Sequence, residues 1–312
     1  MAKPNTTQPD DTHTHSHASD PKRHPEIGDS KQIDFSIPWA QVDVAYQAIL
    51  HKYQPLVKTD GFRKGHAPIK MVEQMVGLER LYQETAEKVL PQAYVEAVKK
   101  ANAKPISDPE IHPTSMEMGK DWVFHAHIAE RPTAELGKYE QIASKAAKQF
   151  DTDQKKLAKP DAKKEPTPET EKVDEQTLKD QKLNAILAAL RESIKPIIPE
   201  LLVRQEAQQQ LDQLAQQMKM YNIELPSYLK SMGKDEADLQ QEYVGRALAS
   251  WQLEIILDGI ALDQKIETKE KELDEMITKN YPDPTTVTPA KRSQVQAMMR
   301  KQKVFEYLLA LK

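Results

Sequence analysis

Hydrophobic and polar positions alternate along residues 31–37 and then change to a helical spacing. The alternation predicts a half-buried strand whose inner side chains are Ile33, Phe35 and Ile37. From 40 to 57, apolar side chains recur every three or four residues, as they do on one face of a helix. This buried face is expected to consist of Val42, Tyr46, Ile49, Leu50 and Tyr53.

The helical spacing returns after a polar loop and continues to about residue 104. A short helix is expected over 69–76, ended by Gly77. A longer helix should follow, kinked where Pro91 interrupts the backbone hydrogen bonds. Its apolar stripe is expected to be Leu78, Leu81, Tyr82, Val89, Leu90, Ala93, Tyr94 and Val98.

Two further strands are expected, over 106–112 and 122–128. In the second strand, His125 and His127 alternate with an apolar set, and we favour a polar sheet face over metal ligation for them. The apolar set is Trp122, Phe124, Ala126 and Ile128. The predicted fold over 31–140 is therefore α+β, a small antiparallel sheet with helices on one face.

A charged segment, 141–182, separates this domain from the rest of the chain. It is rich in Lys, Glu and Asp, holds few large apolar side chains, and contains Pro160, Pro166 and Pro168. Such a composition cannot build a core. We expect a semi-extended linker that can be helical at its ends.

Residues 183–312 carry only helical patterns, which predicts an all-α region. The first helix has an apolar face that ends before Pro196, with Leu183, Ile186, Leu187, Leu190 and Ile194. A second helix is expected over about 200–221, and a short third helix from Pro226 to Gly233.

Asp235 is expected to cap a long helix that reaches Lys265, and Thr268 is expected to cap the next helix. Thr288 and Pro289 should open the last helix. Its inner face is expected to be Val295, Met298, Met299, Phe305, Leu308 and Leu309. The helices are long relative to their apolar stripes, so we expect elongated arms that expose concave surface.

The composition excludes several classes of protein. The 312 residues are 38% hydrophobic and 29% charged with a net charge of −4, which does not suit one compact, deeply buried enzyme domain. Cysteine is absent, which excludes disulfides, thiolate nucleophiles and cysteine-ligated zinc, and the simplest compartment is the cytoplasm. No apolar run is long enough to cross a membrane.

The first 30 residues have low hydrophobicity and no apolar signal segment, so we expect a disordered tail. His13, His15 and His17 alternate within it and could converge on a metal ion. A solvated tail is the favoured interpretation, and no metal or other cofactor is expected. The sequence also lacks a phosphate-binding loop, a His-Glu-x-x-His motif and a nucleophile elbow, so no catalytic residues and no enzyme are expected.

The segment KTDGFRKGHAPIK, residues 58–70, concentrates four Lys and Arg residues, two glycines and one phenylalanine in a chain that is otherwise mildly acidic. Its part DGFRKGHAP resembles the signature loop of the trigger factor family, the bacterial ribosome-associated chaperones. The similarity continues through ERPTAELGKY and through the helical segments from IIPELLVRQEAQQQLDQLAQQM to RKQKVFEYLLALK. These stretches cover most of residues 31–312 in the family's order.

The sequence departs from the family pattern in two places. Family loops usually read Pro-Gly-Phe-Arg-x-Gly-Lys-x-Pro, whereas Asp60 stands here at the first position and His66 where a cation is common. The positions that match are Gly61, Phe62, Arg63, Lys64, Gly65 and Pro68. The family's prolyl-isomerase domain is replaced by the charged segment 141–182, so the resemblance implies that the isomerase is missing.

The resemblance implies an ATP-independent chaperone that docks on the large ribosomal subunit, at the protein and RNA around the tunnel exit. It would shelter nascent polypeptides for folding and export. Arg63 and Lys64 would neutralise phosphates, Phe62 would anchor on an apolar surface or an unstacked base, and Gly61 and Gly65 would let the loop bend. The structural alternative is a basic turn whose Phe62 folds back into its own core.

Three functions stay open: a ribosome-tethered chaperone, a free holdase or assembly chaperone that does not dock, and a prolyl isomerase by family label. A homodimer off the ribosome is also open, and no membrane partner is expected. For client contacts, a promiscuous surface favours adaptable methionines. The candidates beside the Pro226 turn are Met218, Met220, Tyr221 and Leu225, whereas Met298 and Met299 are expected in the core.

Overall fold

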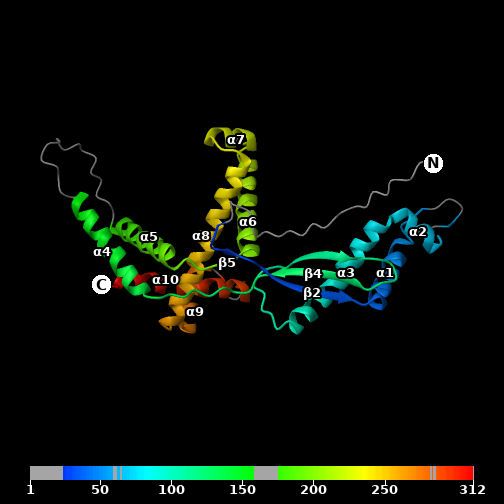
Figure 1. Ribbon diagram of the computed structural model, residues 1–312, viewed down its shortest axis with the longest axis horizontal. Coiled ribbons are helices and arrows are strands. Elements are labelled where there is room, and N and C mark those ends of the chain that lie inside the picture. The colour runs from blue at the N-terminus through cyan, green and yellow to red at the C-terminus, as the bar shows by residue number, and fades with distance from the viewer. Residues whose placement is uncertain are drawn as a thin grey trace, which may run out of the picture.

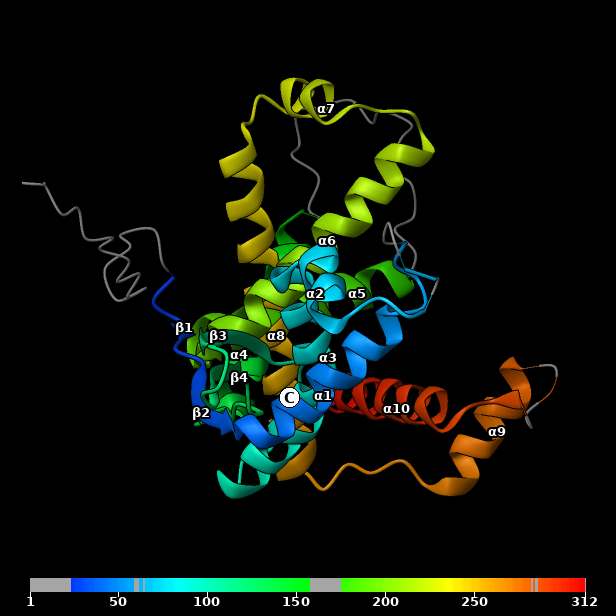
Figure 2. The same ribbon diagram turned by 90° about the vertical axis from the view of Figure 1, so that its right-hand side faces the viewer.

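The protein is described by a computed structural model over residues 24–58, 62–63, 65–157, 175–281, 283 and 286–311. The expectations for His13, His15, His17, Gly61 and Lys64 lie outside these ranges. The molecule is elongated, with an α+β region at one end and a helical body at the other (Figure 1). Two helical arms project from the body in different directions (Figure 2).

The N-terminal region is built on a three-stranded antiparallel sheet. Strand β4 (Trp122–Ile128) lies in the middle, paired on one side with β2 (Lys31–Ile37) and on the other with β3 (Glu110–Ser115). The β2 and β4 predictions are confirmed. Strand β3 begins four residues later than expected and its register shifts between Pro113 and Ser115, because a proline cannot donate to the ladder.

Helices α1 (Trp39–Tyr53) and α3 (Leu78–Lys100) pack on the apolar face of this sheet, and α2 (Ile69–Val76) packs on α1 and α3. The predicted buried face of α1 is confirmed, and Gly77 ends α2 as expected. Leu78, however, is 52% exposed, so its assignment to the buried stripe of α3 is wrong. It lies in the first turn of that helix, directly after Gly77, where the chain enters from the surface.

The opposite face of the sheet is polar, as the alternation predicted for His125 and His127. Trp122, Phe124, Ala126 and Ile128 are buried beneath the helices, whereas the two histidines are only partly buried. They lie beside His112 of β3, with ring centroids 5.3, 5.5 and 6.1 Å apart. Within the described residues, no group of His, Asp and Glu is arranged to hold a metal ion.

Helices α4 (Tyr139–Leu157) and α5 (Glu175–Ile194) form an antiparallel pair at the far end of the body (Figure 1). The expectation that this charged stretch cannot contribute to a core is wrong for α4. Its Ala143 and Ala147 are buried against Ile186 and Leu190 of α5. Small side chains allow this because they let two helices approach closely without large apolar residues.

The first arm consists of α6 (Glu200–Met220), α7 (Leu225–Met232) and the N-terminal half of α8 (Glu236–Asp263). Asp235 caps α8 as expected, because its carboxylate accepts from the Asp238 backbone N–H at 2.8 Å. Gly233 ends α7 in the left-handed conformation that glycine adopts without strain. The buried residues that hold the arm together come from α6 and α8, and α7 adds only the partly buried Tyr228 and Leu229.

The second arm consists of α9 (Glu270–Asn280) and α10 (Pro289–Ala310). Thr288 caps α10 as expected. Thr268 does not cap α9, which begins two residues later with Lys269 at the N-cap, and the Thr268 hydroxyl instead donates to the Gln296 carbonyl at 3.4 Å. Met298 is also not in the core: it is 56% exposed, whereas Met299 is buried.

A short contact that the all-helix pattern did not predict joins the two regions. Strand β1 (Ile27–Gly28) pairs in parallel with β5 (Ile198–Pro199), at the start of α6. The Ser30 hydroxyl accepts a hydrogen bond from the Leu201 backbone N–H at 2.9 Å. A Cβ at Gly28 would lie 2.6 Å from the Ile197 side chain, so a larger residue there would require Ile197 to move.

Candidate functional site

The loop between α1 and α2, residues 58–68, is called the docking loop here. Its base is fixed: the Gln54 side chain donates to the Ala67 carbonyl at 2.8 Å, and Ala67 is buried in the core below. Within the loop, His66 donates its backbone N–H to Arg63 at 2.9 Å, and Gly65 has a φ of +86°. A side chain at that φ would be strained, which explains why this position is a glycine.

Phe62 and Arg63 are both exposed at the outer part of the docking loop. Phe62 is 45% exposed, so it is not folded back into the core of the N-terminal region. Pro68 lies at the N-cap of α2, at the end of the docking loop. Phe62 and Arg63 therefore expose an aromatic ring and a guanidinium at neighbouring positions. The base of the loop that carries them is held by the hydrogen bond from Gln54 to Ala67.

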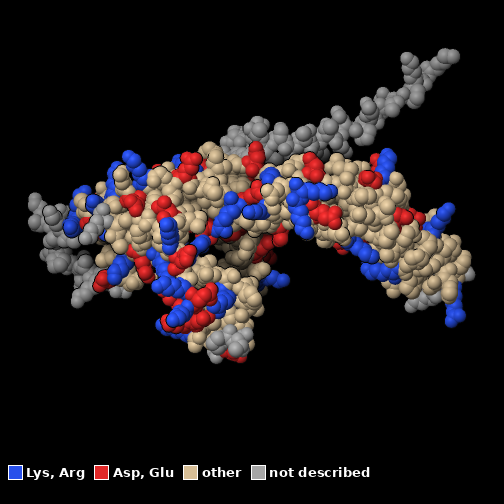
Figure 3. All heavy atoms as spheres, turned by 90° about the horizontal axis from the view of Figure 1, so that it is seen from below, with Lys and Arg blue, Asp and Glu red and all other residues tan. Residues whose placement is uncertain are grey.

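Exposed apolar side chains that the sequence did not indicate lie beside the docking loop. Met71 and Met75 are one helical turn apart on the outer side of α2, while Val72 faces the core. Leu56 and Leu78 are also exposed, at 65% and 52%. Figure 3 shows Lys and Arg side chains projecting around a largely uncharged end of the N-terminal region. The four-residue spacing of Met71 and Met75, with Val72 on the opposite, buried side of α2, is the sequence signal that could have indicated this exposed apolar pair.

A network of polar contacts ties α1 to α2 and α3 beneath the loop. Glu84 of α3 accepts from the Tyr53 hydroxyl and from Lys52 at 2.9 Å, and these two hydrogen bonds lower the pKa of its carboxyl. The Tyr46 hydroxyl donates to Glu73 at 2.7 Å, and burial together with this bond raises the pKa of Tyr46. The docking loop is therefore carried by three helices whose side chains are joined by hydrogen bonds.

The second candidate surface lies where α6 meets α7, at the end of the first arm (Figure 2). Its exposed apolar side chains are called the arm tip: Met220, Tyr221, Ile223, Leu225 and Met232. Met220 and Tyr221 are 69% and 71% exposed, in keeping with the sequence expectation. Met218 is buried, so its assignment to an exposed contact is wrong, while Ile223 and Met232 were not among the candidates.

The reason for the Met218 error is its position in the last turn of α6. Alternate residues of a helix end point in opposite directions, so Met220 faces solvent while Met218 faces the arm. The Ile223 backbone N–H donates to the Met218 carbonyl at 2.9 Å, which folds the chain back over this side chain. The arm tip is therefore carried by the turn after α6 and by α7.

Comparisons with known proteins identify the family. Residues 24–160 match the family model described as bacterial trigger factor protein, and residues 161–310 match the model described as the C-terminus of the same protein. The two matches adjoin, which leaves no space for another domain between them. The described residues contain no helix that is long and apolar enough to cross a membrane.

Curated relatives match the chain over a shorter stretch. The trigger factor of Staphylococcus saprophyticus is 36% identical over 115 residues, which are 37% of this chain and 26% of that protein. The trigger factor of Brevibacillus brevis is 37% identical over 111 residues, with 36% and 26% covered. In these alignments the chain spans 26% of the length of the relatives that it matches.

A solved structure that concerns promiscuous substrate recognition in folding and assembly activities of the trigger factor chaperone has a similar fold. The TM-score is 0.57 at 13% sequence identity, over 90% of this chain and 97% of that chain. The two structures thus share a mostly helical fold that contains a small sheet. The chain belongs to the trigger factor family.

Proposed function

We propose that this protein is an ATP-independent chaperone of the cytoplasm that docks on the ribosome through the docking loop and holds unfolded polypeptides on its arms. The observation that carries the proposal is the pairing of exposed Phe62 and Arg63 on a loop with a fixed base. Ribosomal RNA is a polyanion, so Arg63 and Lys64 gain affinity by displacing counterions. Phe62 adds an apolar contact to a ribosomal protein surface or a base.

The holding function is supported by the arm tip. A polypeptide emerging from the ribosome exposes apolar segments of many shapes, and unbranched methionines adapt to them. Met220 and Tyr221 are exposed at the C-terminal end of α6, and Leu225 and Met232 are exposed at the two ends of α7. Release needs no nucleotide, because many weak contacts give fast dissociation.

The decisive experiment is ribosome co-sedimentation of the full chain and of the triple variant Phe62→Ala, Arg63→Ala and Lys64→Ala. The triple variant should lose ribosome binding while its helicity and Tm stay unchanged. A matched control removes two exposed cations elsewhere, by Lys99→Ala with Lys100→Ala at the end of α3. Binding of the triple variant at wild-type affinity would refute the docking assignment.

A second candidate function is a free holdase that does not dock. The observation that favours it is the reduced positive charge of the docking loop, where Asp60 replaces the family's proline and His66 replaces a common cation. His66 is exposed in the structure, so it could contribute charge only when protonated. Wild-type protein that suppresses aggregation but remains in the supernatant, away from ribosomes, would select this function.

We also infer that the protein does not catalyse prolyl isomerisation. The support is the direct adjoining of the two family matches at residues 160 and 161. A proline-peptide assay should give the uncatalysed rate, on the order of tens of seconds to minutes. Acceleration that follows the protein through further purification would contradict this inference.

A further inference from the structure

The chain crosses from the N-terminal region to the helical body through a segment without regular structure, residues 131–136, called the strap here. It lies directly across α8. Leu136 packs so closely on Gly259 that a Cβ there would lie 3.1 Å from its side chain. Ala134 and Leu136 join the apolar clusters of the body, which seats the strap at its C-terminal end.

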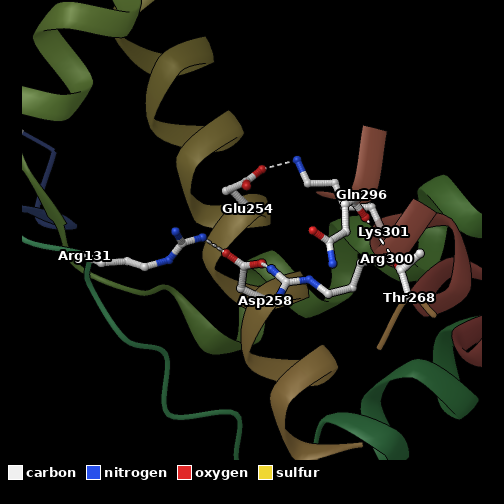
Figure 4. A network of polar contacts seen from close by, with 7 residues as sticks. All are labelled: Arg131, Glu254, Asp258, Thr268, Gln296, Arg300 and Lys301. Carbon is white, nitrogen blue, oxygen red and sulfur yellow. Dashed lines mark hydrogen bonds and ion pairs between the residues drawn. The ribbon is translucent and has the colours of Figure 1, made fainter. Parts of the chain in front are cut away.

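The other end of the strap is held by an ion pair. Arg131 donates to the carboxylate of Asp258, the residue that precedes Gly259 on α8. The Asp258 side chain is only 10% exposed, whereas that of Arg131 is 53% exposed. The second oxygen of the same carboxylate accepts from Arg300 of α10 (Figure 4). One buried anion is therefore shared by the strap and by the second arm.

The two sides of this shared carboxylate are held unequally. On the α10 side, Lys301 also pairs with Glu254, one turn earlier on α8, and Thr268 bonds to the backbone at Gln296 (Figure 4). On the strap side, Arg131 supplies the charge contact. Because Arg131 is the more exposed partner, solvent and salt weaken its pairing first.

The N-terminal region depends on few contacts for its orientation. Its apolar clusters are formed by residues up to 128, and the described residues it adds to the body's clusters are Ile27 and Ala129. The other contacts at the boundary include the two-residue β1–β5 pairing, the Ser30–Leu201 hydrogen bond and the Arg204–Glu110 pair between α6 and β3. Such a small boundary permits movement between domains, whereas a large shared hydrophobic core would prevent it.

We propose that Asp258 is a latch shared by the strap and α10, which couples the orientation of the N-terminal region to that of the second arm. With both arginines bound, two guanidiniums repel each other across one carboxylate. When Arg131 leaves, Asp258 and Arg300 form a neutral pair, and α10 is held more tightly. Release of the N-terminal region thus stiffens the second arm, and by reciprocity loosening of α10 tightens the strap.

The test measures distance distributions between paired spin labels in the full chain. The chain has no cysteine, so each introduced pair is unique. One pair, Val44→Cys with Ser250→Cys, reports the N-terminal region against α8, and a second pair, Ser250→Cys with Glu275→Cys, reports the second arm against α8. All three positions are exposed in the structure.

Arg131→Gln should broaden or shift the distribution of the first pair and narrow that of the second pair, and an unchanged second pair would refute the coupling. The matched control, Arg300→Gln, should show the opposite pattern. Raising the ionic strength from about 0.05 M to about 0.5 M should change the first pair in the wild type but not in Arg131→Gln. An unchanged first-pair distribution in Arg131→Gln would overturn the proposal.

A further variant separates the latch from a loss of folding. Gly259→Ala leaves every charge in place but displaces Leu136 by a few tenths of an ångström. It should broaden the first-pair distribution with little change in Tm. An unchanged first-pair distribution in Gly259→Ala would show that the packing of Leu136 on α8 does not set the orientation of the N-terminal region, which would contradict the role of the strap.

Discussion

Replacing Met220 and Tyr221 together with serine removes two strongly exposed apolar side chains from the arm tip. They are 69% and 71% exposed. Full burial of a large apolar side chain contributes about 2 kcal/mol, so these fractions correspond to roughly 1.4 kcal/mol each. A client that covered both completely would therefore lose ~3 kcal/mol of binding free energy on the double substitution.

The measured loss should be smaller than this sum. A client covers part of the exposed area and gives up conformational entropy on binding. We expect the apparent affinity for an unfolded protein to fall about tenfold, which corresponds to ~1.4 kcal/mol. The assay is suppression of aggregation of a refolding protein without ATP, titrated over chaperone concentration, so that the half-effective concentration rises about tenfold.

Two controls make the result specific. Met298→Ser removes a methionine that is 56% exposed on α10, away from the arm tip, and should leave the half-effective concentration unchanged. Tm should not fall in the double variant, because exposed side chains contribute little to folding. If Met220→Ser with Tyr221→Ser suppresses aggregation at the wild-type concentration, the arm tip is not the client surface.

Four further substitutions test stability. Asp235→Ala should destabilise the fold by about 1 kcal/mol, since it removes the side-chain cap of α8, and thermal unfolding would show it. Leu81→Ala should cost ~2–5 kcal/mol in urea unfolding because Leu81 is fully buried. Leu78→Ala at the exposed position should change stability by less than about 0.5 kcal/mol, and equal losses at both sites would contradict the packing of α3. Burial, followed by the nearby His125 and His112, lowers the pKa of His127, so the folded state favours the neutral ring. This stabilisation is complete above the ordinary pKa of about 6.5 and is lost as the pH falls, so His127→Gln should flatten the acid limb of a stability–pH profile; an unchanged limb would refute it.

The sequence determined the local structure wherever one physical cause acted within a few residues. The alternation of Ile33, Phe35 and Ile37 requires a strand, because successive side chains of a strand point to opposite faces. Asp235, Gly233 and Thr288 mark helix ends through side-chain caps or a left-handed φ, and the structure confirms all three. These signals do not depend on what the helix packs against.

The docking loop was found from the sequence for a similar reason. A cluster of cations, an aromatic residue and glycines within thirteen residues is unusual in this chain, and the resemblance to a known family supplied its meaning. The exposure of Phe62 could not be read from the pattern, because an aromatic side chain in a turn can pack inward or outward with equal ease. The closed base, held by Gln54 and Ala67, depends on residues on either side of the loop.

The errors share one cause. Helical periodicity identifies the apolar face of a helix, but it does not show how much of that face a neighbouring element covers. Leu78 and Met298 fit the apolar spacing of their helices, yet both are exposed because no neighbouring element reaches them. Ala143 and Ala147 were discounted as too small to form a core, yet α5 packs directly on them. Thr268 is a residue type that often caps helices, but its hydroxyl donates instead to the Gln296 carbonyl of α10.

The amino-acid sequence by itself thus determined most of the helices, the central strand and the residue types of the docking loop, because short-range sterics and residue chemistry specify them. Only the tertiary structure decided which apolar side chains remain in solvent, such as Met220 rather than Met218. It also decided that Arg131, Asp258 and Arg300, up to 169 positions apart in the chain (300 − 131), share one buried carboxylate. Contacts of this kind form between elements that are far apart in the sequence, so no local sequence pattern predicts them.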